Sequence, residues 1–179
     1  MTYDNCTTLG FHKKCDNTPG TIVLIKPGGN NKIILGGYNP NTWNNYISSS
    51  SQYYNSNQTY QYSNATFIFS ISVDANDSNA TQLSRVHVGN QAIGCGTSWG
   101  PYFYDDLMTS DDCNSNSDSW YQHTFYKCDL LKRDAGDPKS RWHFKVEEYE
   151  VFHVLKNSAT GHSIEHAFTQ RFTWPSMNS

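Results

Sequence analysis

Two short segments rich in branched aliphatic residues, separated by a turn-forming cluster, place the strongest constraint on the fold of this chain. The segments are residues 21–26 (TIVLIK) and 32–35 (KIIL), and residues 27–31 (PGGNN) lie between them. Branched side chains suit the pleated surface of a strand, whereas proline, glycine and asparagine favour turns. The pattern therefore predicts a β-hairpin near the start of the chain.

Further strands are expected along the sequence. Residues 67–73 (FIFSISV) are apolar at nearly every position, which predicts a central strand covered on both faces. Shorter strands are expected at residues 83–88 and 91–95, and residues 142–155 form the last strong strand. Aromatic residues make up 15% of the chain, and Asn, Ser, Thr and Gln supply much of its polarity, which also favours β structure over helix.

The last strand has an irregular apolar pattern. Strict alternation places Phe144 and Val146 on one face and Tyr149 and Val151 on the other. A bulge near residues 147–148 would restore a single buried face. The alternative is a strand covered on both sides.

Two short helices are expected outside the strands. Residues 10–16 resemble the end of a helix, with Phe11 and Cys15 on one face and residues 19–20 (PG) as a stop. A second, amphipathic helix is predicted near the C-terminus by apolar residues spaced four apart: Ile164, Phe168 and Phe172.

The length of 179 residues fits a single domain. We assign residues 1–156 to it and residues 157–179 to a C-terminal tail that carries the amphipathic helix. Residues 48–63 are almost wholly Ser, Asn, Gln and Tyr, which predicts an exposed loop, and residues 109–119 form a second polar loop.

Charge and hydropathy exclude several classes of partner. The net charge of -3 gives no basic excess for nucleic acid, and no apolar run is long enough to span a bilayer. The first residues (MTYDN) do not have the pattern of a secretory signal. The five cysteines are widely spaced and odd in number, which favours a reduced compartment. We therefore expect a cytoplasmic monomer without membrane insertion.

One observation favours secretion instead. Five Asn-x-Ser/Thr triplets are formal glycosylation acceptors, although such triplets arise by chance in a chain this rich in Asn, Ser and Thr. They begin at Asn5, Asn57, Asn64, Asn76 and Asn79.

The sharpest catalytic motif is residues 162–166 (HSIEH), which match the H-x-x-E-H pattern of helical zinc proteases. Such a site needs a third protein ligand, and no Asp, Glu, His or Cys follows His166. A ligand from upstream would be required, so a solvated face is the simpler interpretation.

Other candidate sites have the same weakness. His12 and Cys15 share a helix face near Cys6, but the paired Cys spacing of structural zinc is absent. Asp111 and Asp112 disfavour a thiolate at Cys113. Residues 74–85 lack the glycine and final glutamate of a calcium loop. No phosphate-binding Gly-Lys-Ser or Gly-Lys-Thr occurs, and we predict no catalytic residue, cofactor or metal.

Three glutamates in the last predicted strand are candidates for contact with a partner. They are Glu147, Glu148 and Glu150. Glu148 and Glu150 share a face by alternation, as in a general-acid pair, but exposed charges or surface contacts are the simpler expectation.

Several segments, in this order, resemble the TLDc family. They are residues 11–17 (FHKKCDN), 21–26, 36–43 (GGYNPNTW), 65–71 (ATFIFSI), 83–86 (LSRV), 92–93 (AI), 100–103 (GPYF), 106–107 (DL) and 146–152 (VEEYEVF). The resemblance runs from about residue 10 to residue 155. Two departures stand out: the N-terminal helical segment is short, and Tyr104 occupies a position where the family commonly has glycine.

The resemblance implies a mainly β (α+β) fold, a two-layer antiparallel β-sandwich with short flanking helices. It also implies a role in protection from oxidative damage and, in some members, binding to the vacuolar-type proton-pumping ATPase, with no agreed active site or cofactor. The motif residues carried over, chiefly for turn geometry and packing, are Gly36, Gly37, Tyr38, Trp43, Gly100, Pro101, Phe103, Asp106 and Leu107.

Three functional hypotheses follow. The first is a non-enzymatic interaction domain that docks a protein, such as peripheral subunits of the V-type ATPase, through a sandwich edge or the strand around Glu148. The second is a thiol-dependent, peroxide-consuming enzyme. The third is a secreted glycan-binding sandwich, suggested by the tyrosines of residues 53–62 and the acceptor triplets.

Overall fold

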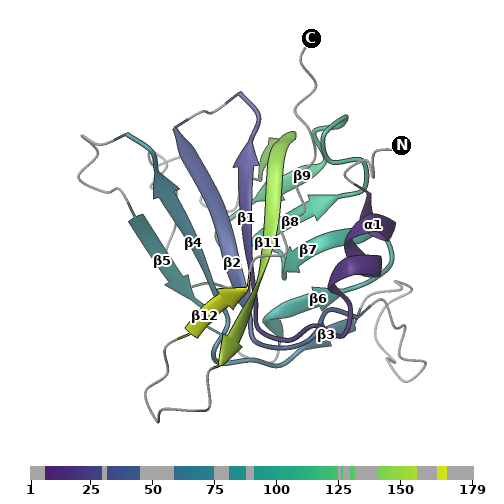
Figure 1. Ribbon diagram of the computed structural model, residues 1–179. Helices are drawn as coiled ribbons and strands as arrows, with labels where there is room; N and C mark the ends of the chain where they lie inside the picture. The colour runs from purple at the N-terminus through teal and green to yellow at the C-terminus, as the bar shows by residue number, and fades with distance from the viewer. Residues whose placement is uncertain are drawn as a thin grey trace.

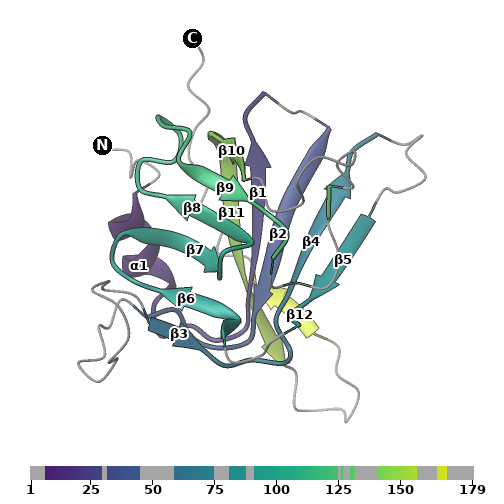
Figure 2. The same ribbon diagram turned by 180° about the vertical axis from the view of Figure 1, so that it is seen from behind.

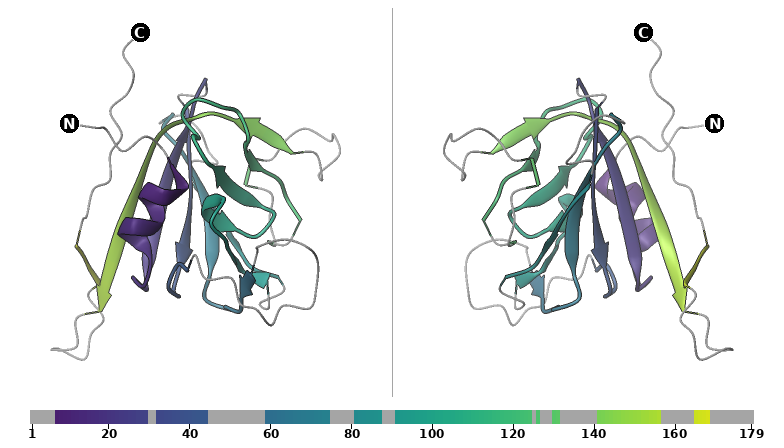
Figure 3. Two further views of the ribbon diagram at one scale, coloured as in Figure 1. Left: turned by 90° about the vertical axis from the view of Figure 1, so that its right-hand side faces the viewer. Right: turned by 90° about the vertical axis from the view of Figure 1, so that its left-hand side faces the viewer.

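The computed structural model describes residues 7–29, 32–44, 59–74, 81–87, 91–124, 126, 130–131, 141–156 and 165–168. Antiparallel sheets stack there as two layers with a helix at their side (Figure 3). The expected β-sandwich is confirmed, with one peripheral helix among the described residues.

The first layer is a six-stranded sheet in the order β12-β11-β1-β2-β4-β5 (Figure 1). Its strands are β1 (Thr21–Pro27), β2 (Ile33–Asn39), β4 (Phe67–Ser72), β5 (Thr81–Arg85), β11 (Val146–Lys156) and β12 (Glu165–Phe168). The predicted hairpin forms β1 and β2, which are paired antiparallel. The predicted strand at 67–73 forms β4, between β2 and β5 and second from the edge of the sheet.

The second layer, seen from behind in Figure 2, is a four-stranded sheet in the order β10-β9-β8-β7. Its strands are β7 (Trp99–Phe103), β8 (Leu107–Ser110), β9 (Ser119–Tyr121) and β10 (Trp142–Phe144). A two-stranded sheet of β3 (Thr59–Gln61) and β6 (Ile93–Cys95) lies beside β7. The prediction of an unpacked loop over residues 48–63 is wrong at β3, because backbone pairing with β6 orders a segment that has little aliphatic content. Residues 45–58 lie outside the described part of the chain.

The segment predicted as one last strand joins the two layers. It divides at Lys145 into β10 in the four-stranded sheet and β11 in the six-stranded sheet. The predicted bulge is confirmed, because Val146 pairs with Pro27 and Glu148 pairs with Lys26, which leaves an extra residue on β11. Val146, Tyr149 and Val151 are therefore all buried.

The C-terminal helix predicted over residues 164–172 is wrong where the chain is described. Residues Glu165–Phe168 form β12, which pairs antiparallel with β11, from His153 opposite Phe168 to Lys156 opposite Glu165. The edge of β11 offers backbone donors and acceptors to another strand. This backbone pairing outweighs the helical spacing of Ile164, Phe168 and Phe172. Only Phe168 of these three residues lies within β12.

The helix predicted at the start of the chain is confirmed as α1 (Thr8–Cys15). The Thr7 side chain accepts a hydrogen bond from the Gly10 amide (3.1 Å) and caps its N-terminus. Phe11 and Cys15 lie on the buried face, as expected from their spacing. The ring of Phe11 meets Trp43 edge to face at 5.3 Å, which fixes α1 beside the sandwich.

Candidate partner-binding surface

The two adjacent glycines of β2 make room for aromatic rings on opposite faces of the six-stranded sheet. A Cβ atom on Gly37 would lie 2.4 Å from the Phe103 ring, on the inner face. A Cβ atom on Gly36 would lie 2.4 Å from the ring of Phe69, on the outer face, and 2.4 Å from the Val23 carbonyl oxygen. Only glycine permits both approaches, so this pair serves packing rather than a turn.

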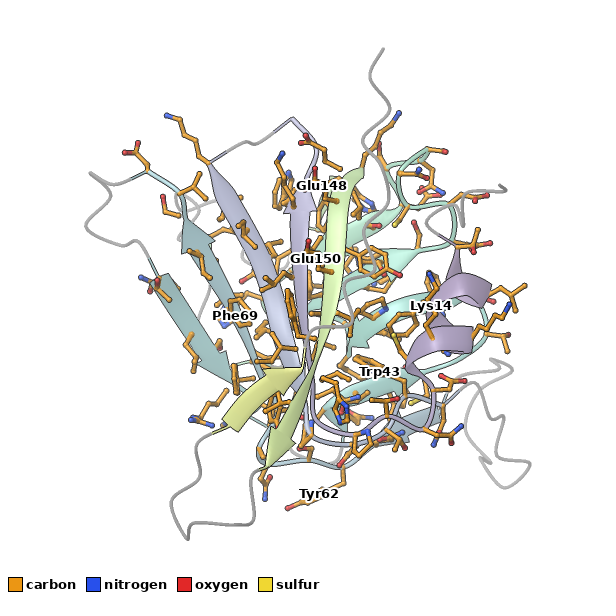
Figure 4. All side chains as sticks on the ribbon, viewed as in Figure 1. Lys14, Trp43, Tyr62, Phe69, Glu148 and Glu150 are labelled. Carbon is orange, nitrogen blue, oxygen red and sulfur yellow. The ribbon has the colours of Figure 1, made fainter. Side chains whose placement is uncertain are left out.

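Trp43 lies in the interior rather than over an edge of the sandwich. Its indole Nε1 donates a hydrogen bond to the Thr21 hydroxyl (2.7 Å), and its ring contacts that of Phe103 edge to face at 5.6 Å. Figure 4 shows Trp43 near the C-terminal end of α1. The structure thus brings Gly37 and Trp43, from one motif segment, together with Phe103, which comes more than fifty residues later in the chain.

The Gly100-Pro101 pair occupies an irregularity in β7. Trp99 pairs with Ser110 and Tyr102 pairs with Met108, so two residues of β7 oppose Thr109 alone. Proline within a sheet is tolerated at such a bulge because it has no amide hydrogen to donate. A Cβ atom on Gly100 would lie 2.4 Å from the Thr109 hydroxyl oxygen, so this position also needs glycine.

Asp106 is fully buried and organises the segment after β9. Its Oδ1 accepts a hydrogen bond from the Thr124 amide (2.9 Å), and its Oδ2 accepts one from the Tyr126 amide (2.7 Å). Its backbone carbonyl accepts from the Gln122 amide (2.9 Å). The carboxylate thus satisfies two backbone amides of this segment, while its neighbour Leu107 is buried in the core.

The outer face of the six-stranded sheet is apolar across several strands. We call it the sheet face, and its register positions are Ile22, Leu24, Tyr38, Phe67, Phe69, Leu83 and Phe152. Tyr38 stacks on Phe67 at 5.3 Å, and Leu83 is 47% exposed. Among the described residues, no second sheet lies over this face, whereas the inner face packs against β7 to β9 (Figures 1 and 3).

Charged residues border the sheet face. Glu148 and Glu150 lie along β11, opposite Lys26 and Leu24 of β1, and share the outer face as alternation predicted (Figure 4). Lys26 donates a hydrogen bond to Glu147 (2.8 Å). This hydrogen bond, together with the charges of Glu147 and Glu148, raises the pKa of Lys26. Lys26 and the three glutamates are all partly exposed, so the ion pair between Lys26 and Glu147 adds little to the stability of the fold.

A family model described as the TLDc domain matches residues 1–155. The chain belongs to the TLDc domain family. No curated protein and no solved structure matches it. The motif residues of this TLDc domain are therefore mainly packing and turn residues of the sandwich, and its outward-facing residues form the candidate binding surface.

The described thiols of this TLDc domain are poorly placed for chemistry. Cys15 and Cys95 are free and buried. Burial, with the charge of Asp16, raises the pKa of Cys15 to about 12, and burial also raises the pKa of Cys95. Cys113 is disulfide-bonded, which differs from the reduced cysteines expected from their spacing, because spacing along the chain does not report distance in space. Cys6 and Cys128 lie outside the described residues.

His12 is held inside the domain rather than presented to a metal. Its Nδ1 lies 2.7 Å from an Asp16 carboxylate oxygen, and its Nε2 lies 3.0 Å from the carbonyl oxygens of both Gly96 and Trp99. Nε2 therefore fastens α1 to the turn between β6 and β7, while Nδ1 is held by the C-cap residue of α1 itself. Within the described ranges, no group of three or more His, Cys, Asp or Glu residues has metal-ligand geometry.

Only parts of the H-x-x-E-H motif and of the calcium-like loop lie among the described residues. Glu165 and His166 of the H-x-x-E-H motif lie in β12, so the helical spacing that the zinc interpretation requires is absent there. Residues 162–164 and half of the calcium-like loop, residues 75–80, lie outside the described chain. No described helix has the length and apolar character needed to cross a membrane.

The sequence analysis missed most of the sheet face. Residues 67–73 carried a signal, because apolar side chains at nearly every position were interpreted as cover on both faces. The structure buries Ile68 completely on the inner face, whereas on the outer face Phe69 is buried and Phe67 is partly exposed. A strand with two apolar faces indicates that its outer face is covered either by another layer of the same chain or by a binding partner. The sequence alone does not distinguish these two possibilities.

Proposed function

We propose that this TLDc domain is a non-enzymatic interaction module that docks a protein partner through the sheet face and the acidic strand β11. The observation that carries the proposal is the apolar outer face of the six-stranded sheet. The solvent-facing side of an antiparallel sheet usually carries polar residues instead. Contiguous apolar surface with a charged border is typical of protein interaction sites.

The proposed partner is the peripheral part of a V-type ATPase, and the proposed context is protection from oxidative stress. Membership of the TLDc family supports an oxidation-resistance type of domain. The ATPase is proposed as the partner because the resemblance to the TLDc family implies that some members bind it. Glu148 and Glu150 supply a negative border that favours a basic patch on the partner.

The thiol-enzyme alternative has less support. A peroxide-reducing cysteine needs an accessible thiolate, whereas Cys15 and Cys95 are buried with raised pKa values. Peroxide consumption by the purified chain, compared with variants in which each of the five cysteines is replaced by serine, tests it. Turnover that disappears with a single cysteine would establish the enzyme and remove our proposal.

The docking experiment is affinity capture from cell extract at low salt. The wild-type chain is compared with a Glu148→Lys, Glu150→Lys double variant and with Leu83→Ser on β5. We expect both variants to recover several-fold less ATPase peripheral subunit, since each disturbs the sheet face. Asp118→Lys is the control, because Asp118 is exposed just before β9 of the four-stranded sheet and is not a residue of the sheet face.

The outcomes separate the surface from the partner. Recovery of a partner that is equally sensitive to Asp118→Lys would exclude the sheet face as the specific surface. Recovery of a stable partner that is not an ATPase subunit would retain docking and reject the ATPase.

A further inference from the structure

A cluster of tyrosines and one carboxylate lies on the second layer, away from the sheet face. The rings of Tyr60 from β3 and Tyr104 from the β7–β8 turn meet edge to face at 4.7 Å. Tyr102 lies beside them, 6.5 Å from Tyr60, and its hydroxyl donates to the Asp105 carboxylate (3.0 Å). We call Tyr60, Tyr102, Tyr104 and Asp105 the aromatic corner.

The packing beneath the aromatic corner is tight and specific. Tyr60 pairs with Gly94 across the two-stranded sheet, and a Cβ atom on Gly94 would lie 2.1 Å from the Tyr102 ring. Tyr102 is therefore seated against the backbone and only 3% exposed. Tyr60, at 38% exposed, and the partly exposed Tyr104 and Asp105 present the solvent side of the cluster.

Tyr104 adopts a backbone conformation that disfavours it. Its φ of 44° lies in the left-handed region, where glycine is favoured and a residue with a side chain costs about 1 kcal/mol or more. The sequence resemblance places a glycine at this position in the family. Strained residues of this kind cluster at functional sites, and Tyr104 shares its positive φ with Asn17 and Asp112.

Charge makes the aromatic corner electronegative. Burial is the main cause of the raised pKa values of Tyr60, Tyr102 and Tyr104, and the charge of Asp105 raises all three further. One carboxylate is therefore near three phenol groups. A partly exposed aromatic face beside a carboxylate attracts an organic cation.

The same layer already holds one cation over an aromatic ring, although its hydrogen-bond partner there is a side-chain amide rather than a carboxylate. The guanidinium of Arg141 lies 4.2 Å from the ring centroid of Trp120, and its Nε donates to the Gln122 side chain (3.3 Å). Trp120 connects back to the aromatic corner through Trp99, at 5.7 Å, and Trp99 lies 6.1 Å from Tyr102. A stacked guanidinium is thus compatible with the geometry of this aromatic surface.

We propose that the aromatic corner binds an arginine side chain displayed by a protein partner. The planar guanidinium stacks against the ring of Tyr104, beside Tyr60, and its N–H groups donate to the carboxylate of Asp105, which retains acceptor capacity beyond the hydrogen bond from Tyr102. Arginine is favoured over lysine because only a planar, weakly hydrated cation satisfies both contacts. This site does not depend on docking at the sheet face.

The test is an amide-shift titration of the isotope-labelled full chain. The probe is a Gly/Ser peptide with one central arginine, and the matched peptide carries citrulline, which has the same shape without the charge. We expect the arginine peptide to shift the signals of Tyr60 and residues 102–106, and the citrulline peptide to leave them unchanged. Tyr104→Gly should weaken arginine binding by about 3- to 30-fold, the factor that corresponds to the usual range of cation–π energies.

The variants keep the result interpretable. Tyr104→Gly places the residue that the left-handed backbone favours, so the variant is expected to fold. Asp105→Asn should weaken binding, and Tyr62→Ala, which removes a 63% exposed tyrosine outside the aromatic corner, should not. The Glu148→Lys, Glu150→Lys variant should bind the peptide normally, which separates this site from the proposed docking surface.

Three outcomes would overturn the proposal. They are equal shifts with citrulline, unchanged affinity in folded Tyr104→Gly, and shifts of the same signals by neutral hexoses but not by the arginine peptide. The last result would indicate a glycan site instead.

Discussion

The six-stranded sheet and the four-stranded sheet of this TLDc domain are stabilised by different interactions. In the first, β1 alternates buried and partly buried side chains along its whole length, and Val23, Ile25 and Leu35 fill the inner face. In the second, strands of three to five residues are supplemented by buried polar side chains. Asp106 and Ser119 both accept hydrogen bonds from backbone amides there.

This difference has a structural consequence. Long strands satisfy most of their backbone groups by pairing, so fewer of these groups need a side-chain partner. Short strands leave many loop groups unpaired, and side chains must satisfy these groups instead. Tyr121, for example, accepts from the Leu130 amide (2.7 Å), and the Tyr126 hydroxyl donates to the Ala92 carbonyl (3.0 Å). We therefore expect the replacement of buried polar side chains to lower the stability of the second layer more than that of the first.

The largest effect is expected at Asp106. Replacing Asp106 by alanine leaves the Thr124 and Tyr126 amides without their partner, which should lower the free energy of unfolding by about 3–5 kcal/mol. Urea denaturation of the wild type, Asp106→Ala and Asp106→Asn measures it. A loss below about 1 kcal/mol would show that apolar packing, rather than the carboxylate, stabilises the second layer.

The contact between the layers is tested at Gly37. The added methyl of Gly37→Ala meets the Phe103 ring, and overpacking of this kind should cost about 1–3 kcal/mol of unfolding free energy. Gly28→Ala is the matched control, since its Cβ would be 3.4 Å from its nearest neighbour. Equal thermal midpoints for the two variants would contradict tight packing at Gly37.

Alkaline pH should destabilise both layers through buried tyrosines. Burial raises the pKa values of Tyr126 and Tyr149 well above the ordinary value, so the folded state keeps protons that the unfolded state loses. Their stabilising contribution is full below pH about 10 and falls by up to about 1.4 kcal/mol per pH unit and tyrosine above it. Unfolding measured against pH should show a smaller alkaline slope in Tyr149→Phe and in Tyr126→Phe. An unchanged slope in either variant would show that its tyrosine ionises without unfolding.

The smallest effect is expected for the ion pair on the first layer. Lys26→Met or Glu147→Gln should change the unfolding free energy by less than about 1 kcal/mol, because the pair is partly exposed. Denaturation at low and high salt measures the change. A loss comparable to that of Asp106→Ala would remove the contrast between the two layers.

Much of the first layer could be predicted from local sequence. The hairpin, β4, the bulge in β11 and the helix with Phe11 and Cys15 all follow from patterns within one segment. The end of the chain could not be predicted in the same way. The edge of β11, which β12 pairs with, exists only once the sheet has formed, so the spacing of Phe168 and its neighbours gave the wrong structure.

The two candidate sites also differ in whether local sequence predicts them. Glu148 and Glu150 were predicted to share a face, because alternation along a strand is a local property. The aromatic corner was not predicted, since Tyr60 and Tyr104 are brought together only by the pairing of β3 with β6 and by the turn after β7.

The sequence by itself determined the family, the β-rich class and the strands whose apolar pattern is continuous, since these depend on the chemistry of neighbouring residues. Only the tertiary structure decided which apolar face is buried between the layers, that β12 extends the six-stranded sheet, and that Tyr60, Tyr104 and Asp105 meet. The physical reason is that burial and pairing depend on which segments approach one another in space, and a pattern of period two or four within one segment carries no record of that approach.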